Sequence, residues 1–112
     1  MDAAELEAAL TAMLARYDGR LERARIYGIE VLHRPGTRAH DWFAGVRPGK
    51  GSAKLMRLPI KDHPEILEGV SPALLKRRSG DALFTLKPGD EELLPELEAV
   101  VARAFAAYQG GR

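Results

Sequence analysis

The spacing of apolar residues changes twice along these 112 residues, and this change limits the possible folds more than any other feature. Apolar residues near the N-terminus recur at helical spacing: Leu6, Leu10, Met13, Leu14 and Tyr17. From residue 24 to residue 58 apolar and polar residues tend to alternate, which is typical of strands. Helical spacing returns after residue 90. Helices at both ends of a run of strands predict an α+β domain.

Turn and cap signals divide this pattern into elements. The sequences RPGT (34–37) and PGKG (48–51) separate three predicted strands, at 24–33, 40–47 and 52–58. Ser71-Pro72 is a typical helix start, so we predict a short helix from there to Arg78. A fourth strand is expected at 81–87, and Asp90 is expected to cap the last helix.

We therefore predict a single α+β domain over residues 1–112, in the order α-β-β-β-α(short)-β-α. Its antiparallel sheet should have about four to five strands, with the two terminal helices packed on one face. Ile26, Leu32 and Leu83 fall on the face away from those helices. Part of that face is thus apolar, and the 59–80 segment, a ligand or a second subunit should cover it.

Composition excludes several classes of protein. Cysteine is absent, which rules out disulfides and thiolate chemistry. The N-terminus has acids near its start and no long apolar run, so we expect neither a signal peptide nor a membrane span. No serine lies in a G-x-S-x-G setting. We predict a bacterial, cytoplasmic protein that is not an enzyme, with no catalytic residues and no cofactor.

The net charge of +1 conceals a polarised chain. Residues 1–18 carry four acids and one arginine, and residues 88–112 carry five acids and two arginines, a balance of −3 in each case. Residues 19–61 carry ten Lys or Arg and three acids, a balance of +7. The predicted sheet is thus basic and the terminal helices are acidic, which favours an anionic partner.

The stretch FAGVRPGKGSAKL (43–55) superficially resembles a phosphate-binding loop. Such a loop needs two glycines four residues apart, followed by Lys and then Ser or Thr, between a strand and a helix. Here Gly45 and Gly49 are separated by only three residues, Lys50 precedes Gly51, and the continuation alternates like a strand. We interpret the stretch as a hairpin connection of four or five residues with Pro48 and Gly49 at its bend.

The histidines offer a weak case for a metal site. His33 and His40 would approach each other if the first two strands pair, and Asp41, Asp62 or His63 could supply further ligands. However, consecutive strand residues point to opposite faces, and no HExxH spacing occurs. We predict no metal site.

The segments WFAGVRPGKGSAKLMRLP, HPEILEGVSPALLKRRSGDALFTLK and ELEAVVARAFAAY together resemble small bacterial proteins of the YdhG-like family, over about residues 24–108. Members of that family have no agreed activity. Some are labelled frataxin-like iron chaperones, and this label would imply iron binding by surface carboxylates of the first helix, here Asp2, Glu5 and Glu7.

The basic sheet supplies the leading functional hypothesis, a non-enzymatic binding domain. We expect it to recognise an anionic small molecule or an acidic protein surface through five residues: Trp42, Arg47, Lys50, Lys54 and Arg57. Nucleic acid is a less favoured partner, because only 6% of the residues are aromatic and no RNP-like signature occurs. An iron chaperone and a structural homodimer are the alternatives.

Overall fold

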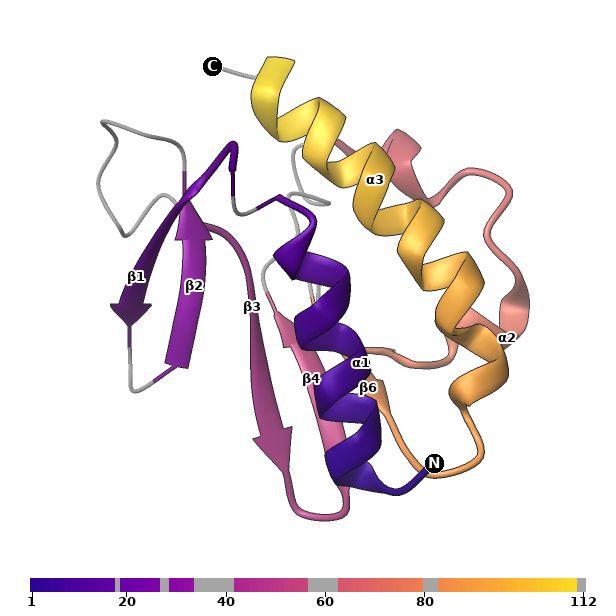
Figure 1. Cartoon of the computed structure of the whole chain (residues 1–112). Helices are drawn as coiled ribbons and strands as arrows, with labels where there is room; N and C mark the ends of the chain where they lie inside the picture. The colour runs from indigo at the N-terminus through magenta and orange to yellow at the C-terminus, as the bar shows by residue number, and fades with distance from the viewer. Residues whose placement is uncertain (18, 27–28, 34–41, 57–62, 80–82, 111–112) are drawn as a thin grey trace.

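A computed structural model describes the chain except residues 18, 27–28, 34–41, 57–62, 80–82 and 111–112 (Figure 1). It gives only the backbone of residues 26, 29, 30, 42, 109 and 110. The elements follow in the order α1 (Ala3–Ala15), β1 (Glu22–Ile26), β2 (Ile29–His33), β3 (Trp42–Gly49), β4 (Ser52–Met56), η2 (Pro64–Leu67), α2 (Pro72–Leu75), β5 (Arg78–Ser79), β6 (Leu83–Leu86), η3 (Glu91–Leu93) and α3 (Leu94–Gly110). The predicted α+β class is confirmed.

Helix α1 forms where the sequence predicts it. The Asp2 carboxylate accepts a hydrogen bond from the Glu5 N–H at 2.8 Å, and the Glu5 carboxylate accepts one from the Asp2 N–H at 3.0 Å. This capping box satisfies two N–H groups that a helix start otherwise leaves without partners. The helix buries one stripe, Leu6, Leu10, Met13 and Leu14, against β3 and β4. The helical spacing of apolar residues thus fixes which face of α1 meets the sheet.

The sheet has six strands in the order β1-β2-β3-β4-β6-β5, and every neighbouring pair is antiparallel. The single strand predicted at 24–33 is wrong: it is a hairpin of β1 and β2 in which Ile26 is opposite Ile29. Alternation alone concealed the boundary between the two strands, because it is present in both β1 and β2. The two-residue strand β5 was also missed, since the short helix ends at Leu75 instead of Arg78.

Both terminal helices cover the same face of the sheet, as predicted (Figure 1). Phe43, Leu55 and Phe84 are fully buried in the core between these helices and the sheet. Phe43 lies where the β2–β3 register shifts, and its ring contacts those of Tyr17, Phe105 and Tyr108. The residue inserted at this shift thus joins the sheet to α3 and to the end of α1.

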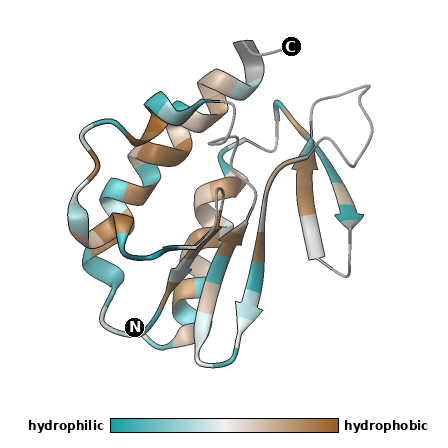
Figure 2. Cartoon of the chain, turned by 180° about the vertical axis from the view of Figure 1, so that it is seen from behind, coloured by the Kyte–Doolittle hydropathy of each residue, from teal (hydrophilic) through white to brown (hydrophobic). Residues whose placement is uncertain are grey.

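The segment after β4 belongs to the same core. Ile66, Val70 and Leu74 are buried together with the side chains of α1 and α3. In the described part of the 59–80 segment, η2 and α2 therefore pack in this core beside α3 and do not cover the opposite face of the sheet. The expected position of Leu32 on that opposite face is wrong, because Leu32 is buried in the same core. Figure 2 views the molecule from behind, and hydrophilic and hydrophobic residues alternate along β3 and β4, as expected for strands with one buried face. No helix in the described ranges is long and apolar enough to cross a membrane.

Candidate anion-binding face

The hairpin of β3 and β4 places two of the predicted site residues directly opposite each other. Arg47 pairs with Lys54, and Lys54 pairs in turn with Thr85 of β6. The next row along the strands is Val46, Leu55 and Phe84, and Leu55 and Phe84 are fully buried under the helices. Because side chains alternate between the two faces of a sheet, Arg47, Lys54 and Thr85 lie on the face away from the helices.

The turn of this hairpin is shorter than predicted. Gly49 still pairs with Ser52, so the connection consists of Lys50 and Gly51 alone, and Pro48 and Gly49 belong to β3. Gly51 has a φ of 70°, which glycine adopts without a steric penalty. The expected hairpin is therefore confirmed, but its position at Pro48-Gly49 is wrong. The bend carries Lys50 at the tip, close in sequence to Arg47 and Lys54.

Arg47, Lys50 and Lys54, which we call the basic hairpin cluster, have no ion pair or hydrogen-bond partner for their side chains among the described residues. Some cations elsewhere have a carboxylate or an aromatic ring as a partner, whereas the exposed side chains of Lys76, Lys87 and Arg103 have no hydrogen bond or ion pair among the described residues. Arg16 pairs with Glu98, and the guanidinium of Arg20 lies 5.8 Å from the centre of the Phe105 ring. The basic hairpin cluster is therefore uncompensated within the described part of the molecule.

Two predicted contacts cannot be placed on this face. Arg57 lies outside the described residues, and Trp42 begins β3 but only its backbone is described. Of the five predicted site residues, the structure thus brings together Arg47, Lys50 and Lys54. It adds Thr85, which only the strand register reveals.

The residues considered for metal binding have other contacts where they are described. Asp2 and Glu5 form the capping box of α1, and His33 is buried with its Nε2 3.9 Å from a carboxylate oxygen of Glu22. Nδ1 of His63 lies 3.1 Å from a carboxylate oxygen of Glu65. His40, Asp41 and Asp62 lie outside the described residues. Within the described ranges, no group of three or more His, Asp or Glu is placed to hold a metal ion.

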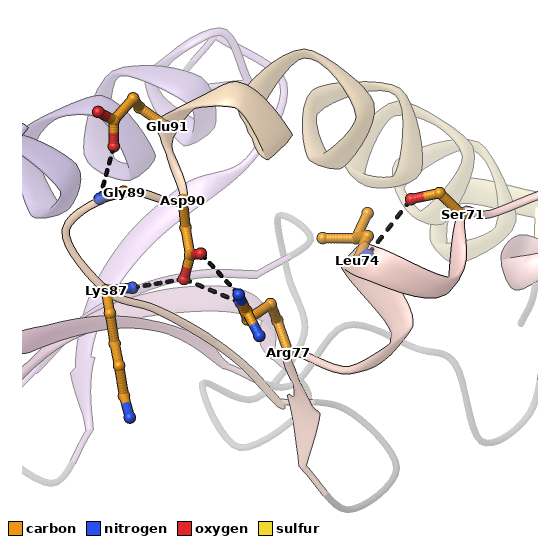
Figure 3. A network of polar contacts seen from close by, with 7 residues as sticks. All are labelled: Ser71, Leu74, Arg77, Lys87, Gly89, Asp90 and Glu91. Carbon is orange, nitrogen blue, oxygen red and sulfur yellow. Dashed lines mark hydrogen bonds and ion pairs between the residues drawn. The ribbon is translucent and has the colours of Figure 1, made fainter.

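A second polar cluster surrounds Asp90 (Figure 3). Asp90 was expected to cap the last helix, but its side chain makes no capping bond. Instead it accepts hydrogen bonds from Nε and Nη2 of Arg77, each 2.9 Å, and from the Lys87 N–H. Burial alone would raise the pKa of Asp90, but these hydrogen bonds outweigh it and lower the pKa.

Further hydrogen bonds attach the start of α3 and the turn before it to the rest of the chain. The Glu96 carboxylate accepts hydrogen bonds from the Ser71 hydroxyl at 2.5 Å and from the Ser71 N–H at 2.8 Å, and these lower the pKa of Glu96. Ser71 is the predicted N-cap of α2, with its hydroxyl 3.3 Å from the Leu74 N–H. Glu91 accepts from the Gly89 N–H and the Met1 amine. All these polar groups satisfy one another, so we assign them a structural role.

A shallow groove of about 360 Å³ runs between α1 and α3. Ala9, Ala12, Met13 and Leu94 line it, and Arg16 and Glu98, which are paired with each other, complete it. A ligand site normally combines an apolar lining with a few available polar groups that orient the ligand. The two charged groups of this groove already compensate each other, so the basic hairpin cluster is the stronger candidate.

Comparisons of this chain with protein-family models, with curated proteins and with solved structures found no match. The resemblance to the YdhG-like family therefore stays a prediction. The argument for function depends on the residues described above.

Proposed function

We propose that this protein is a non-enzymatic binding domain that recognises an anionic small ligand or an acidic protein surface through the basic hairpin cluster. One observation carries the proposal: Arg47 and Lys54 are directly opposite each other on the same face of the sheet, and no carboxylate among the described residues pairs with either.

Like charges at directly opposite positions destabilise an antiparallel pair. Their Cβ atoms are about 5 Å apart. A single anionic group between the two side chains would contact both cations and remove the repulsion. Lys50 at the hairpin tip extends the positive surface at its exposed end. Binding of an anion between Arg47 and Lys54 would therefore be favoured by the relief of their repulsion.

The geometry favours this function over the two alternatives. An iron chaperone would need clustered oxygen ligands, whereas two of the three acids proposed for that role, Asp2 and Glu5, hydrogen-bond to each other's backbone. A homodimer through the open face would bring the unpaired cations into an interface. Among the described residues, no specific observation supports either alternative.

The proposal predicts a salt-sensitive affinity that depends on this cluster. The double variant Arg47→Glu/Lys50→Glu should lose retention on an anionic matrix, because it reverses two exposed cations of the cluster. Its melting temperature should change little, since neither side chain is buried. Chromatography on heparin or a sulfonate resin, with elution by a salt gradient, measures the effect.

Charge reversal lowers the net charge of any variant, so a matched control is essential. Lys76→Glu/Arg103→Glu makes the same change in net charge at two exposed cations of α2's end and α3. We expect this control to elute at a higher salt concentration than the cluster variant. Equal elution of the two variants would show that net charge alone governs retention, and the proposed site would be wrong.

A further inference from the structure

Two parallel rows of side chains cross the open face of the sheet. Arg47, Lys54 and Thr85 form the first, which we call the donor row, on three adjacent strands. Gly45, Met56 and Leu83 form the second, the apolar row, on the same three strands. The rows are two residues apart, so they lie on the same face at a separation of about 7 Å.

The donor row has the chemistry to hold a phosphate group. Arg47 offers several N–H donors in a planar fork, Lys54 a point charge and Thr85 a hydroxyl. Within the described part of the chain, the Thr85 hydroxyl makes no hydrogen bond, and Arg47 is exposed while Lys54 and Thr85 are partly exposed. A phosphate monoester presents about two negative charges and three acceptor oxygens, one for each of the three donors. A carboxylate carries only one negative charge, so it would balance only one of the two cations.

The apolar row indicates which kind of chemical group should be attached to the phosphate. Met56 and Leu83 are partly exposed, whereas Gly45 and the adjacent Val31 of β2 are buried, so only the end of the row formed by Met56 and Leu83 is accessible to a ligand. Methionine adapts its shape to flat and irregular apolar surfaces. An aromatic ring or short alkyl chain attached to the phosphate would therefore lie over Met56 and Leu83 while the phosphate contacts the donor row.

From these rows we infer that the open face binds a small phosphate monoester with an apolar group, the phosphate on Arg47, Lys54 and Thr85 and the apolar group on Met56 and Leu83. The inference rests on the proposed function, since it uses two of the three cations of the basic hairpin cluster, and it narrows the anion to one chemical class.

Calorimetric titration with three probes tests both rows: 1-naphthyl phosphate, inorganic phosphate and 1-naphthol. Covering partly exposed apolar surface on Met56 and Leu83 should make 1-naphthyl phosphate bind about tenfold more tightly than inorganic phosphate. Naphthol alone should bind more weakly than either. Equal affinities for the two phosphates would overturn the inference and leave the basic hairpin cluster in place as a general anion site.

Variants of each row test its contribution to binding separately. Met56→Gln should remove the tenfold preference and leave inorganic phosphate binding unchanged. Arg47→Lys keeps the charge but loses the planar fork, so it should weaken both phosphates by a similar factor. Leu83→Gln serves as a second apolar-row variant, and the melting temperature of each variant shows that it is folded. Retention of the preference in folded samples of both apolar-row variants would contradict the inference.

Two further results would overturn the inference. If neither phosphate binds while the cluster variant still loses retention on the anionic matrix, the partner is a larger acidic surface and only the inference fails. If 1-naphthyl phosphate binds equally well to wild type and to Arg47→Glu/Lys54→Glu, it binds elsewhere. Loss of the difference between cluster and control variants on the matrix, by contrast, would refute the proposed function itself.

Discussion

At the scale of single residues, the described polar side chains divide into those with partners and those without. Asp90 is 7% exposed and accepts three hydrogen bonds from Arg77 and Lys87. Arg47 and Lys54, in contrast, are opposite each other, and no carboxylate among the described residues forms an ion pair with either side chain. A protein tolerates unpaired charges most easily where water or a ligand can reach them. The contrast gives Asp90 a structural role and leaves Arg47 and Lys54 accessible to a ligand.

The paired carboxyl of Asp90 should make the fold sensitive to acid. Its pKa in the folded state is lowered, whereas an unfolded Asp titrates near about 3.9. Above that pH the stabilisation is fully present, and it is lost as the pH falls through the folded-state pKa, because the unfolded chain then binds more protons. Urea unfolding followed from neutral pH to about pH 2 should show this loss.

The variant Asp90→Asn should abolish much of that pH dependence and cost about 1–3 kcal/mol at neutral pH, because it removes the charge-assisted bonds to Arg77. Glu68→Gln is a suitable control, since Glu68 is exposed and its side chain makes no hydrogen bond to a described residue. An unchanged acid transition in Asp90→Asn would mean that other carboxyls, such as that of Glu96, dominate it.

At the scale of elements, the stability of the β3–β4 hairpin depends on the backbone conformation of its turn. Gly51 has a φ of 70°, whereas Gly19 is not in the left-handed region and an added Cβ there would meet no atom within 4 Å. Gly51→Ala should therefore destabilise the protein by about 1–2 kcal/mol, and Gly51→Asn by less, because Asn tolerates this conformation better. Gly19→Ala should have little effect. Chemical denaturation of the three variants measures these differences.

Gly49 tests a different aspect of the same hairpin. A Cβ at Gly49 would lie 2.3 Å from the Ser52 hydroxyl, and Ser52 is buried. Gly49→Ala should thus be destabilising, and Gly49→Ala/Ser52→Gly should recover part of the loss by removing that hydroxyl. If Gly49→Ala were as stable as the wild type, the close pairing of Gly49 with Ser52 would be contradicted.

The elements were predicted from sequence wherever local signals determine them. The capping box and apolar stripe specify α1, and Ser71-Pro72 specifies the start of α2. Non-local features were missed. Nothing near Arg77 in sequence indicates its bonds to Asp90, and only the register of β4 against β6 places Thr85 beside Lys54. Sequence reasoning therefore identified the cations of the site but not the rows that they form.

At the scale of the whole molecule, the two faces of the sheet differ in kind. One face carries α1 and α3, which contain four of the protein's sixteen acids, Glu5, Glu7, Glu96 and Glu98, and Asp2 caps α1. The other carries Arg47 and Lys54. Within the described part of the chain, the two helices therefore carry more acids than cations, whereas Arg47 and Lys54 of the open face are both cations. An anionic partner is attracted to one side and repelled from the other.

This polarity also bears on the homodimer alternative. A two-fold interface places the same patch of both subunits together, so a dimer through the open face would bring Arg47 and Lys54 of one copy close to those of the other. The free-energy penalty of burying uncompensated cations in such an interface would exceed the gain from burying the partly exposed Met56 and Leu83.

We therefore expect a monomer by light scattering from micromolar to millimolar concentration at low salt. High salt screens exposed charges, so it is the condition that would most favour such a dimer. A stable dimer at low salt that Met56→Gln disrupts would show that the open face binds a second copy instead of an anion.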